Sequence, residues 1–490
     1  MFDVAIIGNG ATAIATLKAL NFLSIRHNIN FAIGLVGRIS NMGFGVAYNE
    51  ANDYAIMNTP VSNISIDSED SMSFVKWARN KGLYYLGDNA IPRRIYGNYL
   101  YDMAMELHDK KRVTFIDSMA CDIDCGDDGY EIIMQNESRV RTKYLILCTG
   151  NDSSKWNDFY GLTGHAKFIY NPYPLYVQLS KLKESEDTLI LGSGLTAVDI
   201  AVALYWKNHQ GKIIICSREG RLPSVKANAK LYIPRWCRFD HFLQIFNKQN
   251  RKLSLRQIFR LVRRELRTVN ANWIDIFFSK GFETADSFSE KIYQAQKGLP
   301  WLDVLIGIQH EVDKSWAYVN SRHKEIFIKS YLSSVLKAIA PMPLINANIL
   351  NKLLSENRLE IMGGIRSIDD NGKGFDINCI ENVSFKVDNI INASGFNREI
   401  SYNSGTFITN LLNKKIIHPH PSGGIKVCAE TGRVFPNQNI FAVGHLTMGE
   451  HPLINNIELI VINAKETALA LVKELMEMNP ITIHKTAYAL

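Results

Sequence analysis

Two stretches of this 490-residue sequence place closely spaced glycines at the end of an apolar run. The first reads VAIIGNGATAIATL from Val4 to Leu17, where Gly8, Gly10 and Ala13 fit the spacing G-x-G-x-x-[GA]. In a strand, turn and helix, Gly8 permits the tight turn, Gly10 lets a phosphate approach the backbone, and Ala13 allows close packing. Free N–H groups at the helix start attract the phosphate charge. The stretch predicts a pyrophosphate-binding turn; the alternative is a glycine turn without a ligand.

The strand expected after this turn lacks the acidic residue that usually holds the ribose of a dinucleotide. It reads NFAIGLVGRI from Asn30 to Ile39, and Val36, Gly37 and Arg38 stand where the acid is expected. Either backbone groups or Arg38 hold the ribose, or binding at this turn is weaker than usual.

The second stretch, LILGSGLTAVDIAVAL, repeats the pattern with Gly192, Gly194 and Ala197. The strand expected after it, KIIICSREGRLP, ends in Ser217 and Arg218. An acid at this point favours NAD, whereas a guanidinium forms charge-assisted hydrogen bonds with the 2′-phosphate of NADPH. We therefore predict an NADPH site here; the alternative for Arg218 is a surface residue that ends a strand.

Two such turns in one chain indicate two nested dinucleotide folds, with FAD in the first and NADPH in the second. The nicotinamide would then pass hydride to the flavin across the domain interface. Further apolar strands support the nesting: KYLILCTGN ends at Gly150, VDNIINASGFNRE contains Gly395, and NIFAVGHLTMGEHP contains Gly444. A helix is expected from about Ile457 to Leu475, and its N-terminus could face the flavin ring.

The expected fold class is α/β, with two nested Rossmann-like domains of three layers (ββα) and a mainly helical insert. The FAD-binding domain is expected at residues 1–155 and 396–490, and the NADPH-binding domain at 156–224 and 346–395. The insert, at 225–345, shows helical periodicity and few glycines, and we expect it to form a cap over the substrate pocket.

One expected helix of the insert, LSLRQIFRLVRRELR, carries a basic face. Its arginines recur at helical spacing while the apolar residues fall mostly elsewhere. The arginines are Arg256, Arg260, Arg263, Arg264 and Arg267. Either this face is simply solvated, or it docks an acidic partner such as a carrier protein or a membrane surface.

These residues together resemble the flavoproteins with two dinucleotide-binding domains, a group that includes Baeyer–Villiger, N-hydroxylating and flavin-containing monooxygenases. More closely, the chain resembles bacterial proteins described only as FAD/NAD(P)-binding. The resemblance covers most of residues 1–225 and 345–475. It is carried by short pieces in a fixed order: the first glycine turn, GFGVAY, MNTPVSNIS, FVKWA, IPRRIYGNYL, GSGLTAVDIA, SREGRLP and the strand before Gly444. It implies FAD and NADPH as cofactors, with a small molecule and O₂ as substrates.

Monooxygenases of this kind carry a motif of the form FxGxxxHxxx(aromatic) before the second glycine turn. The sequence matches it at Phe159, Gly161 and His165, while Ile169 stands in the aromatic position and Tyr170 follows one place late. The resemblance implies that His165 lies at the domain interface and helps to position NADPH; the alternative is a surface histidine. At Ile169 the sequence departs from the Baeyer–Villiger pattern.

Several other polar residues fall on loops expected to face the cofactors. Asn58 could hydrogen-bond the flavin ring, and Arg93 or Arg94 could pair with pyrophosphate or with reduced flavin. The alternative is a pair of surface arginines before a helix. His445 and His451 flank the expected flavin-facing helix and are candidates for proton transfer, because imidazole titrates near neutral pH.

The composition is that of an ordinary globular protein, with 46% hydrophobic and 21% charged residues and a net charge of +7. This charge does not predict nucleic-acid binding, and no apolar run is long enough to span a bilayer. The first strand is expected at Phe2, which leaves no room for a signal peptide. Seven scattered cysteines without a CxxC pair indicate reduced thiols, predict no metal site, and argue against a dithiol flavin reductase. We expect a cytoplasmic protein of unknown oligomeric state.

The function that combines these expectations is that of an FAD- and NADPH-dependent monooxygenase. NADPH would reduce FAD, and one oxygen atom of O₂ would then reach a ketone by Baeyer–Villiger insertion, or an amine or thioether by N- or S-oxygenation. The resemblance suggests specialised metabolite synthesis. Two alternatives stay open: a flavin-dependent NAD(P)H reductase or dehydrogenase without oxygen insertion, and a non-catalytic scaffold that binds dinucleotides.

Overall fold

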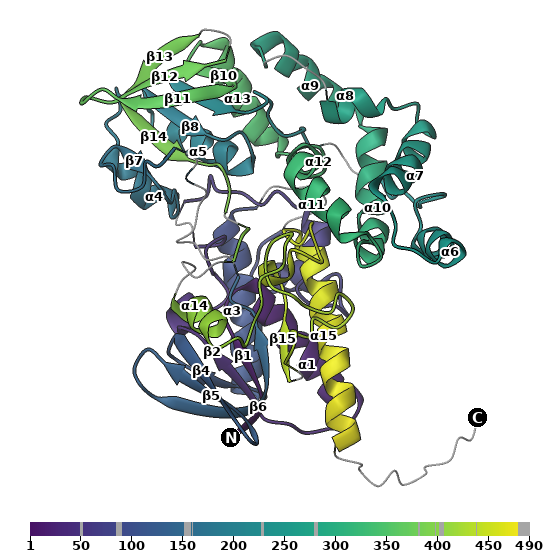
Figure 1. Ribbon diagram of the computed structural model, residues 1–490. Helices are drawn as coiled ribbons and strands as arrows, with labels where there is room; N and C mark the ends of the chain where they lie inside the picture. Colours follow the sequence, from purple (N-terminus) through teal and green to yellow (C-terminus); the bar gives the residue numbers. More distant parts are fainter. Residues whose placement is uncertain are drawn as a thin grey trace.

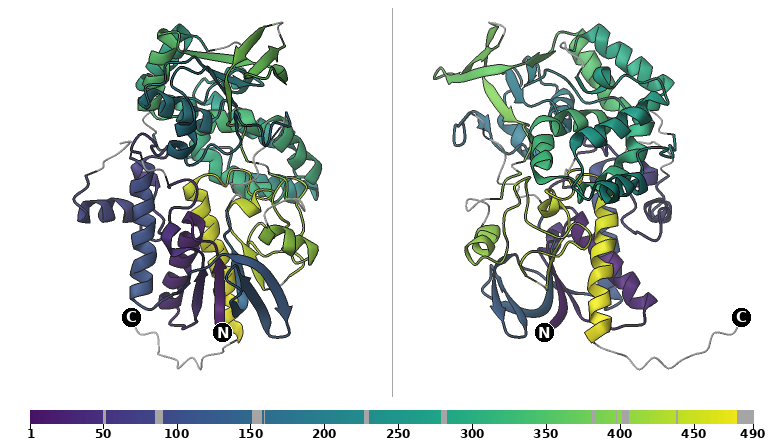
Figure 2. Two further views of the ribbon diagram at one scale, coloured as in Figure 1. Left: turned by 90° about the vertical axis from the view of Figure 1, so that its left-hand side faces the viewer. Right: turned by 45° about the vertical axis from the view of Figure 1, so that its right-hand side comes forward.

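In the computed structural model the chain forms two sheet-containing units and a helical insert (Figure 1). The structure describes residues 1–49, 52–84, 91–150, 158, 160–226, 230–278, 283–380, 383–396, 398–400, 406–437 and 439–478. In both views of Figure 2 the first unit, in purple, blue and yellow, lies below the second unit and the insert, which are mainly teal and green.

The first unit is built on a parallel sheet that continues into an antiparallel hairpin. Its parallel strands are, in spatial order, β3 (Thr114–Ile116), β2 (Ile33–Val36), β1 (Phe2–Ile7), β6 (Arg139–Leu147) and β15 (Ile440–Ala442). The first half of β6 also pairs with β5 (Gly129–Met134), which pairs with β4 (Ala120–Gly126). Because β15 comes from the C-terminal part of the chain, the second unit and the insert lie within the first unit in sequence.

Alternate residues of β1 pack into two separate hydrophobic cores, as strand geometry requires. Val4 and Ile6 lie in a core shared with the helices on one face of the sheet. Ala5 and Ile7 lie in the core of the opposite face, with residues of β4 and β5. The helices of this unit are α1 (Ala11–Arg26), α2 (Ser73–Asn80), α3 (Arg93–Asp109), α14 (Thr406–Asn413) and α15 (Ile457–Met478). Helices α1 and α15 lie side by side against the sheet (Figure 1).

The second unit repeats this plan. Its parallel strands are, in spatial order, β10 (Leu359–Gly363), β9 (Ile213–Ser217), β8 (Thr188–Leu191), β14 (Asn389–Asn392) and β7 (Phe168–Ile169). One face is covered by an antiparallel sheet of β11 (Ile365–Asp370), β12 (Phe375–Cys379) and β13 (Ser384–Val387). Its helices are α4 (Leu175–Gln178), α5 (Leu195–Trp206) and α13 (Leu344–Ser355). These layers confirm the expected α/β fold class of two nested Rossmann-like domains.

The turn after the first strand of each glycine motif is held by the same kind of contact. Gly8 has φ +125°, and a Cβ there would lie 2.2 Å from the carbonyl oxygen of Cys148, just after β6. Gly192 has φ +120°, and its Cβ would lie 2.3 Å from the carbonyl oxygen of Ala393, just after β14. Both the conformation and the close approach require glycine. The sequence repeat therefore reflects a structural repeat.

The insert is a group of helices that contacts both units. They are α6 (Phe239–Gln249), α7 (Leu255–Arg267), α8 (Trp273–Phe278), α9 (Ala285–Lys297), α10 (Pro300–Trp316), α11 (Ser321–Ser330) and α12 (Leu332–Ile339). Helix α9 packs against α13 of the second unit. Toward the first unit, the indole N–H of Trp316 donates to the Gly449 carbonyl oxygen at 3.1 Å, and Lys324 pairs with Glu450 at 2.5 Å.

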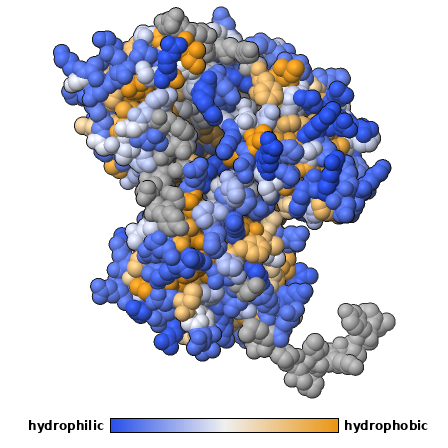
Figure 3. All heavy atoms as spheres, viewed as in Figure 1, coloured by the Kyte–Doolittle hydropathy of each residue, from blue (hydrophilic) through white to orange (hydrophobic). Residues whose placement is uncertain are grey.

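The surface seen in Figure 3 is mainly hydrophilic, most continuously over the insert at the upper right. None of the helices in the described ranges combines the length and the low charge content that crossing a bilayer requires. All seven cysteines lie in described segments, and none forms a disulfide bond there.

Candidate functional site

One continuous cavity of about 2210 Å³ lies where the two units and the insert meet. It is lined by both glycine turns, by residues at the ends of β2 and β9, by the loop after β14 and by the first turn of α15. Tyr232, Ile306 and Leu332 line it from the insert. A typical pocket for one small ligand measures about 300–1,000 Å³. This cavity therefore has room for more than one ligand.

The first glycine turn shows which glycine the protein needs and which a ligand needs. Gly8 is required by the fold, as its contact with Cys148 shows. Gly10 has φ −87° and ψ −172°, which any residue adopts, and a Cβ there would meet nothing nearer than Gly45 Cα at 3.9 Å. Gly10 lines the cavity together with Ala11 at the start of α1, where no side chain caps the free N–H groups. The turn thus fits a phosphate group that approaches the backbone closely.

The second turn gives the same result independently. Gly194 has φ −80° and ψ −171°, and a Cβ there would have no atom of the protein within 4 Å. It lines the cavity with Leu195 and Thr196, the first residues of α5. Ala13 and Ala197, the third positions of the two motifs, are fully buried, as expected for close helix packing.

Basic residues follow the second strand of each unit, as the sequence predicted. Arg38 lines the cavity after β2, and its guanidinium donates to the Gln135 side-chain oxygen at 3.1 Å. Ser217 and Arg218 line it after β9, where Ser217 accepts a hydrogen bond from Ser193 at 2.8 Å. Arg218 is exposed and forms no ion pair with a described residue. Its charge is therefore available to a ligand phosphate.

Arg366 is a residue of this group that sequence reasoning missed. It lies on β11 and lines the same cavity, where its guanidinium donates to the Ile380 carbonyl oxygen at 3.3 Å. β11 directly follows β10, whose last residue, Gly363, pairs with Ser217 of β9, and Arg366 lines the same cavity as Ser217 and Arg218. No local sequence pattern indicates this, since the residues are far apart in the chain.

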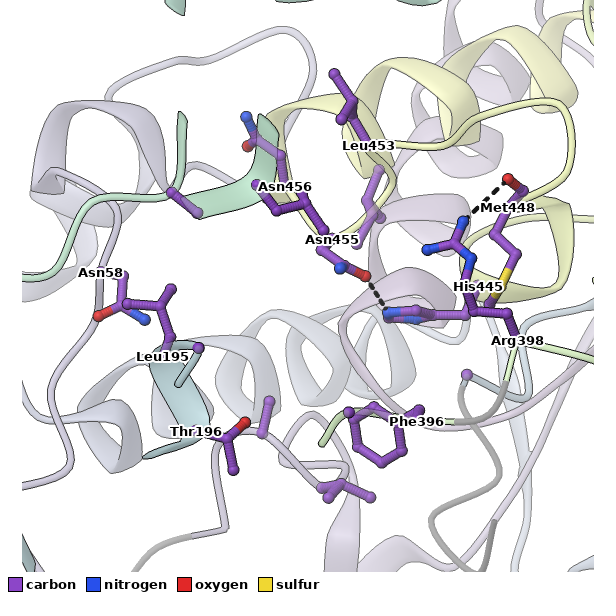
Figure 4. Close-up of a pocket in the computed structure, with 18 of the residues that line it drawn as sticks. Asn58, Leu195, Thr196, Phe396, Arg398, His445, Met448, Leu453, Asn455 and Asn456 are labelled. Carbon is purple, nitrogen blue, oxygen red and sulfur yellow. Dashed lines mark hydrogen bonds between the residues drawn. The ribbon is translucent and has the colours of Figure 1, made fainter. Parts of the chain in front are cut away.

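At the other end of the cavity, side chains of both units face one another (Figure 4). Asn58 and Leu195 lie on one side, and His445 and Arg398 lie on the other. The side-chain oxygen of Asn58 is buried and has no hydrogen-bond partner. An orphaned buried acceptor is expected where a ligand donates the missing bond. Asn58 therefore fits its predicted contact with a flavin ring.

The start of α15 also faces this end of the cavity, which is where the sequence placed a flavin-facing helix. Asn455, Asn456, Ile457 and Glu458 line the cavity. The predicted bounds of this helix, Ile457 to about Leu475, agree with the observed helix to within three residues at its C-terminus. Its N-terminal N–H groups give this end of the cavity a positive potential.

His445 lies in the cavity, but it does not titrate near neutral pH as we expected. Burial lowers its pKa to about 4, although a hydrogen bond with the Asn455 side-chain oxygen at 2.8 Å opposes the shift and Arg398 adds to it. The imidazole is therefore neutral at physiological pH. His451 is a structural residue: its ring nitrogens face Asp313 at 2.9 Å and the Ala429 carbonyl oxygen at 3.1 Å.

Arg398 is the second residue that sequence reasoning missed. It follows β14, lines the cavity beside His445, and donates one long hydrogen bond of 3.4 Å to the Met448 carbonyl oxygen. Its Nε is buried without a partner, and no described carboxylate pairs with it. Burial lowers the pKa of Arg398 to about 10, so the guanidinium stays charged at neutral pH. An unbalanced buried cation in a cavity indicates an anionic group on a ligand.

Arg93 and Arg94, which the structure places in the first turn of α3, do not have the predicted role. Arg93 lines the cavity, but its charge is neutralised by Asp199 at 2.7 Å, so it is not available to pyrophosphate or reduced flavin. Arg94 is exposed, pairs with Asp53 at 2.5 Å and does not line the cavity. Sequence reasoning could not anticipate either carboxylate partner.

His165 does not lie at the domain interface, which corrects the expectation from the monooxygenase motif. Its ring packs on Phe375 with centroids 4.6 Å apart, and its Nε2 lies 3.2 Å from an Asp370 carboxylate oxygen. Both partners belong to the antiparallel sheet of the second unit, and His165 does not line the cavity. Phe159, the first residue of the motif, lies outside the described residues.

The two remaining predicted glycines differ in position. Gly150 has φ +69° and lines the cavity. Gly444 has φ +85° and is not in the cavity wall; a Cβ there would lie 2.8 Å from the Thr12 hydroxyl oxygen of α1. Gly444 therefore allows the last strand of the sheet to approach the first helix, and positions the neighbouring His445.

Comparisons with known proteins agree with this geometry. Residues 5–152 match the family model described as FAD-NAD(P)-binding, which spans β1 to the turn after β6. This match shows an FAD/NAD(P)-binding domain at the first glycine turn. A search of curated protein sequences finds no significant match.

Solved structures with the same fold include ornithine hydroxylases and a cadaverine monooxygenase. The reduced form of an ornithine hydroxylase from Pseudomonas aeruginosa has 12% identity and a TM-score of 0.56, covering 97% of this chain and 100% of that chain. An ornithine N-hydroxylase from Kutzneria with reduced FAD, NADP⁺ and L-ornithine has 12% identity and a TM-score of 0.55, covering 97% and 100%. A cadaverine monooxygenase from Erwinia amylovora bound to FAD has 13% identity and a TM-score of 0.55, covering 100% and 97%.

Proposed function

We propose that this chain is an FAD- and NADPH-dependent monooxygenase. The observation that carries the proposal is one cavity reached by two glycine turns, at Gly10 and Gly194, where the protein itself does not require glycine. Two dinucleotides bound at these turns would meet inside the cavity. The net reaction consumes NADPH, H⁺, O₂ and substrate, and yields NADP⁺, water and a substrate with one added oxygen atom.

The residues of the first unit fit the flavin cofactor. The N–H groups at the start of α1 face the cavity for the pyrophosphate, and Arg38 stands where the ribose is expected. Asn58 offers an unpartnered acceptor, and the start of α15 offers N–H groups for negative charge that develops on reduction. When bound, FAD supplies the redox chemistry, and these residues bind and orient it.

The residues of the second unit fit NADPH better than NADH. The start of α5 faces the cavity for the pyrophosphate, and Ser217, Arg218 and Arg366 converge where the 2′-phosphate of the adenosine ribose is expected. Two guanidinium groups and a hydroxyl supply the charge and the donors that a phosphate group binds. The acid nearest the end of β9 in the chain, Glu219, lines the cavity, but its carboxylate is already held by Lys337 at 3.2 Å and by the Ser334 hydroxyl at 3.0 Å.

For the oxygenation type we favour N-hydroxylation of a primary amine. Neighbours of the same fold are named as ornithine hydroxylases and as a cadaverine monooxygenase, and the Baeyer–Villiger motif is not supported at His165. The balanced reaction converts R–NH₂, O₂, NADPH and H⁺ into R–NHOH, NADP⁺ and H₂O. The insert closes one side of the cavity, which would limit access of bulk water to the reacting groups.

A screen of primary amines tests this proposal. The FAD-loaded protein would be given NADPH, O₂ and a panel of diamines and amino acids, and hydroxylamine formation and hydrogen peroxide would be measured. We expect at least one amine to raise NADPH oxidation and to yield hydroxylamine in near-equal amount. NADPH oxidation that produces only hydrogen peroxide with every amine would favour a flavin reductase instead.

The basic face of α7 supports a proposal for a partner as well. All five of its arginines are exposed, and none pairs with a described carboxylate. The one acid of the helix, Glu265, is turned inward and accepts hydrogen bonds from the backbone N–H groups of Arg235, Trp236 and Cys237 at 2.6–2.9 Å. A face of one charge sign fits an acidic protein such as a carrier domain.

A binding measurement with an acidic carrier domain tests this partner. The Arg260→Glu/Arg264→Glu variant should weaken binding at least about tenfold, while Arg26→Glu in the first unit should not. Equal binding by both variants would contradict docking on α7. Membrane attachment through α7 is disfavoured, because its apolar residues Ile258 and Val262 are buried in the insert.

A further inference from the structure

A buried ion pair joins the two units at the edge of the cavity. A guanidinium nitrogen of Arg93 lies 2.7 Å from a carboxylate oxygen of Asp199. Arg93 is the first residue of α3 in the first unit, and Asp199 belongs to α5 in the second unit. The two residues are only 8% and 4% exposed. Solvent therefore screens the pair little, and it holds two specific helices together.

On the side of the first unit, Arg93 is tied to a segment that lines the cavity. Its Nε donates to the Ile56 carbonyl oxygen at 3.0 Å, and its backbone N–H donates to the Ala55 carbonyl oxygen at 2.7 Å. The next residues, Met57 and Asn58, line the cavity at its reacting end. A shift of Arg93 would therefore move Asn58, the residue that fits the flavin ring.

On the side of the second unit, Asp199 lies one helical turn after the residues that line the cavity. Leu195 and Thr196 face the same space as Asn58 (Figure 4). Tyr173 also lines the cavity, and its hydroxyl donates to Asp199 at 3.4 Å. Burial raises the pKa of Tyr173 to about 12, so the hydroxyl keeps the proton that it donates. The carboxylate therefore has a charged and a neutral partner, one from each unit.

Stability alone is a weak reason for such a pair. The desolvation of two charges offsets most of their attraction, and apolar residues of similar size often serve folding as well. A directional contact between the two cofactor-binding units also fixes the distance between the cofactors that they hold. This distance matters because hydride transfer requires the reacting atoms to lie about 3–3.5 Å apart. Arg93 itself and the residues one turn before Asp199 line the cavity, so the pair lies beside the space in which the two cofactors would meet.

We propose that Arg93 and Asp199 are positioning residues that hold the nicotinamide side of the cavity against the flavin side for hydride transfer. This inference rests on the proposed function, because it requires both cofactors. The step moves a hydride, two electrons and one proton, from NADPH to FAD, which takes one further proton from solvent; NADPH is oxidised and FAD is reduced. Neither residue exchanges a proton in this step.

The test separates hydride transfer from binding and from folding. The FAD-loaded Asp199→Asn protein, which keeps the shape of the side chain but not its charge, is mixed anaerobically with increasing NADPH, and flavin reduction is followed by absorbance. We expect the limiting reduction rate to fall about tenfold to a hundredfold, as misplacement by about 1 Å predicts, with NADPH affinity within about threefold of the unchanged protein. Reduction by dithionite, which needs no second unit, should keep its rate.

A matched control is the Glu450→Gln protein. Glu450 forms a similarly buried ion pair with Lys324, but that pair joins the insert to the first unit. The Glu450→Gln substitution should lower the melting temperature without lowering the limiting rate of flavin reduction by NADPH. If Asp199→Asn does not accumulate with FAD bound, Tyr173→Phe removes one partner of the carboxylate at less risk and should lower the same rate by a smaller factor.

Three results overturn the inference. The first is an unchanged NADPH reduction rate in the folded Asp199→Asn and Tyr173→Phe proteins. The second is an equal loss of the dithionite rate, which would place the effect in the flavin site itself. The third is a wild-type protein whose flavin is reduced by dithionite but not by NADPH. This result would contradict the proposed function and this inference together. A lower rate of flavin reduction by NADPH, with an unchanged rate of reduction by dithionite, would support the positioning role.

Discussion

Substitution of Gly194 by alanine tests whether the second glycine turn holds a ligand. Its backbone conformation is open to alanine, and the added Cβ would meet no protein atom within 4 Å. Gly194 is the N-cap of α5, where alanine is less favourable than glycine by roughly 0.5–1 kcal/mol. The melting temperature should therefore fall by only about 0.5–1 °C in a chain of this size. If a pyrophosphate lies against this backbone, the methyl group displaces it.

The expected loss of affinity follows from the hydrogen bonds at the helix start. A hydrogen bond to a charged group contributes about 1.5–3 kcal/mol. Loss of one such bond raises the dissociation constant about tenfold to a hundredfold, since each 1.4 kcal/mol is a factor of ten. We therefore expect Gly194→Ala to bind NADP⁺ about tenfold to a hundredfold more weakly, while its FAD content stays unchanged.

Gly192→Ala is the matched control, because there the protein itself excludes the side chain. Its φ of +120° and the 2.3 Å approach to the Ala393 carbonyl oxygen force the backbone to move. Strain of this kind amounts to about 1–3 kcal/mol or more, so this variant should lose stability first. NADP⁺ titration, followed by calorimetry, and thermal unfolding measure the two effects. A folded Gly194→Ala protein with unchanged NADP⁺ affinity would refute the assignment of this turn.

Three further predictions concern charged or titratable groups in the cavity. Arg218→Ala and Arg366→Ala should each raise the KM for NADPH about tenfold and leave that for NADH nearly unchanged, in steady-state NAD(P)H oxidation; equal effects would exclude a 2′-phosphate site. Arg398→Gln should weaken binding of an anionic ligand without unfolding the chain, measured as loss of the flavin spectral change that small carboxylates induce, and a response equal to wild type would contradict this role. His445 should make stability fall as pH falls. Its folded pKa of about 4 lies below the usual value near 6.5, so between these values the unfolded chain binds a proton that the native chain does not. The free energy of unfolding, measured with urea on the protein without cofactors between these two pH values, should depend less on pH in His445→Gln than in wild type.

The fold was predictable because its signals are local. Each glycine motif combines an apolar strand, a tight turn and a helix start within about fifteen residues, and the contacts of Gly8 and Gly192 with the neighbouring strand explain why glycine is needed there. Helical periodicity likewise indicated the basic face of α7, whose apolar residues Ile258, Val262 and Leu266 are buried. Short-range physics determines these elements, so a single sequence reveals them.

The polar contacts of the site were less predictable, because they join distant parts of the chain. Asp199 neutralises Arg93 across 106 positions, and Asp370 contacts His165 across 205 positions. Both pairings changed the predicted role of the basic residue. Arg366 and Arg398 reach the cavity from the second half of the chain, on a strand and a loop without any motif. Only the packing of the two units shows which of these charges meet and which stay unpaired.

The measurement that tests the central claim most directly is the reaction of the reduced protein with oxygen. The FAD-loaded protein is reduced anaerobically with one equivalent of NADPH and then mixed with oxygenated buffer in a stopped-flow spectrophotometer. A monooxygenase is expected to show a transient absorbing species, distinct from oxidised and reduced flavin, that outlives the reaction of free reduced flavin with O₂. Direct return to oxidised flavin with one equivalent of hydrogen peroxide, in the presence of the amine panel as well, would contradict the account.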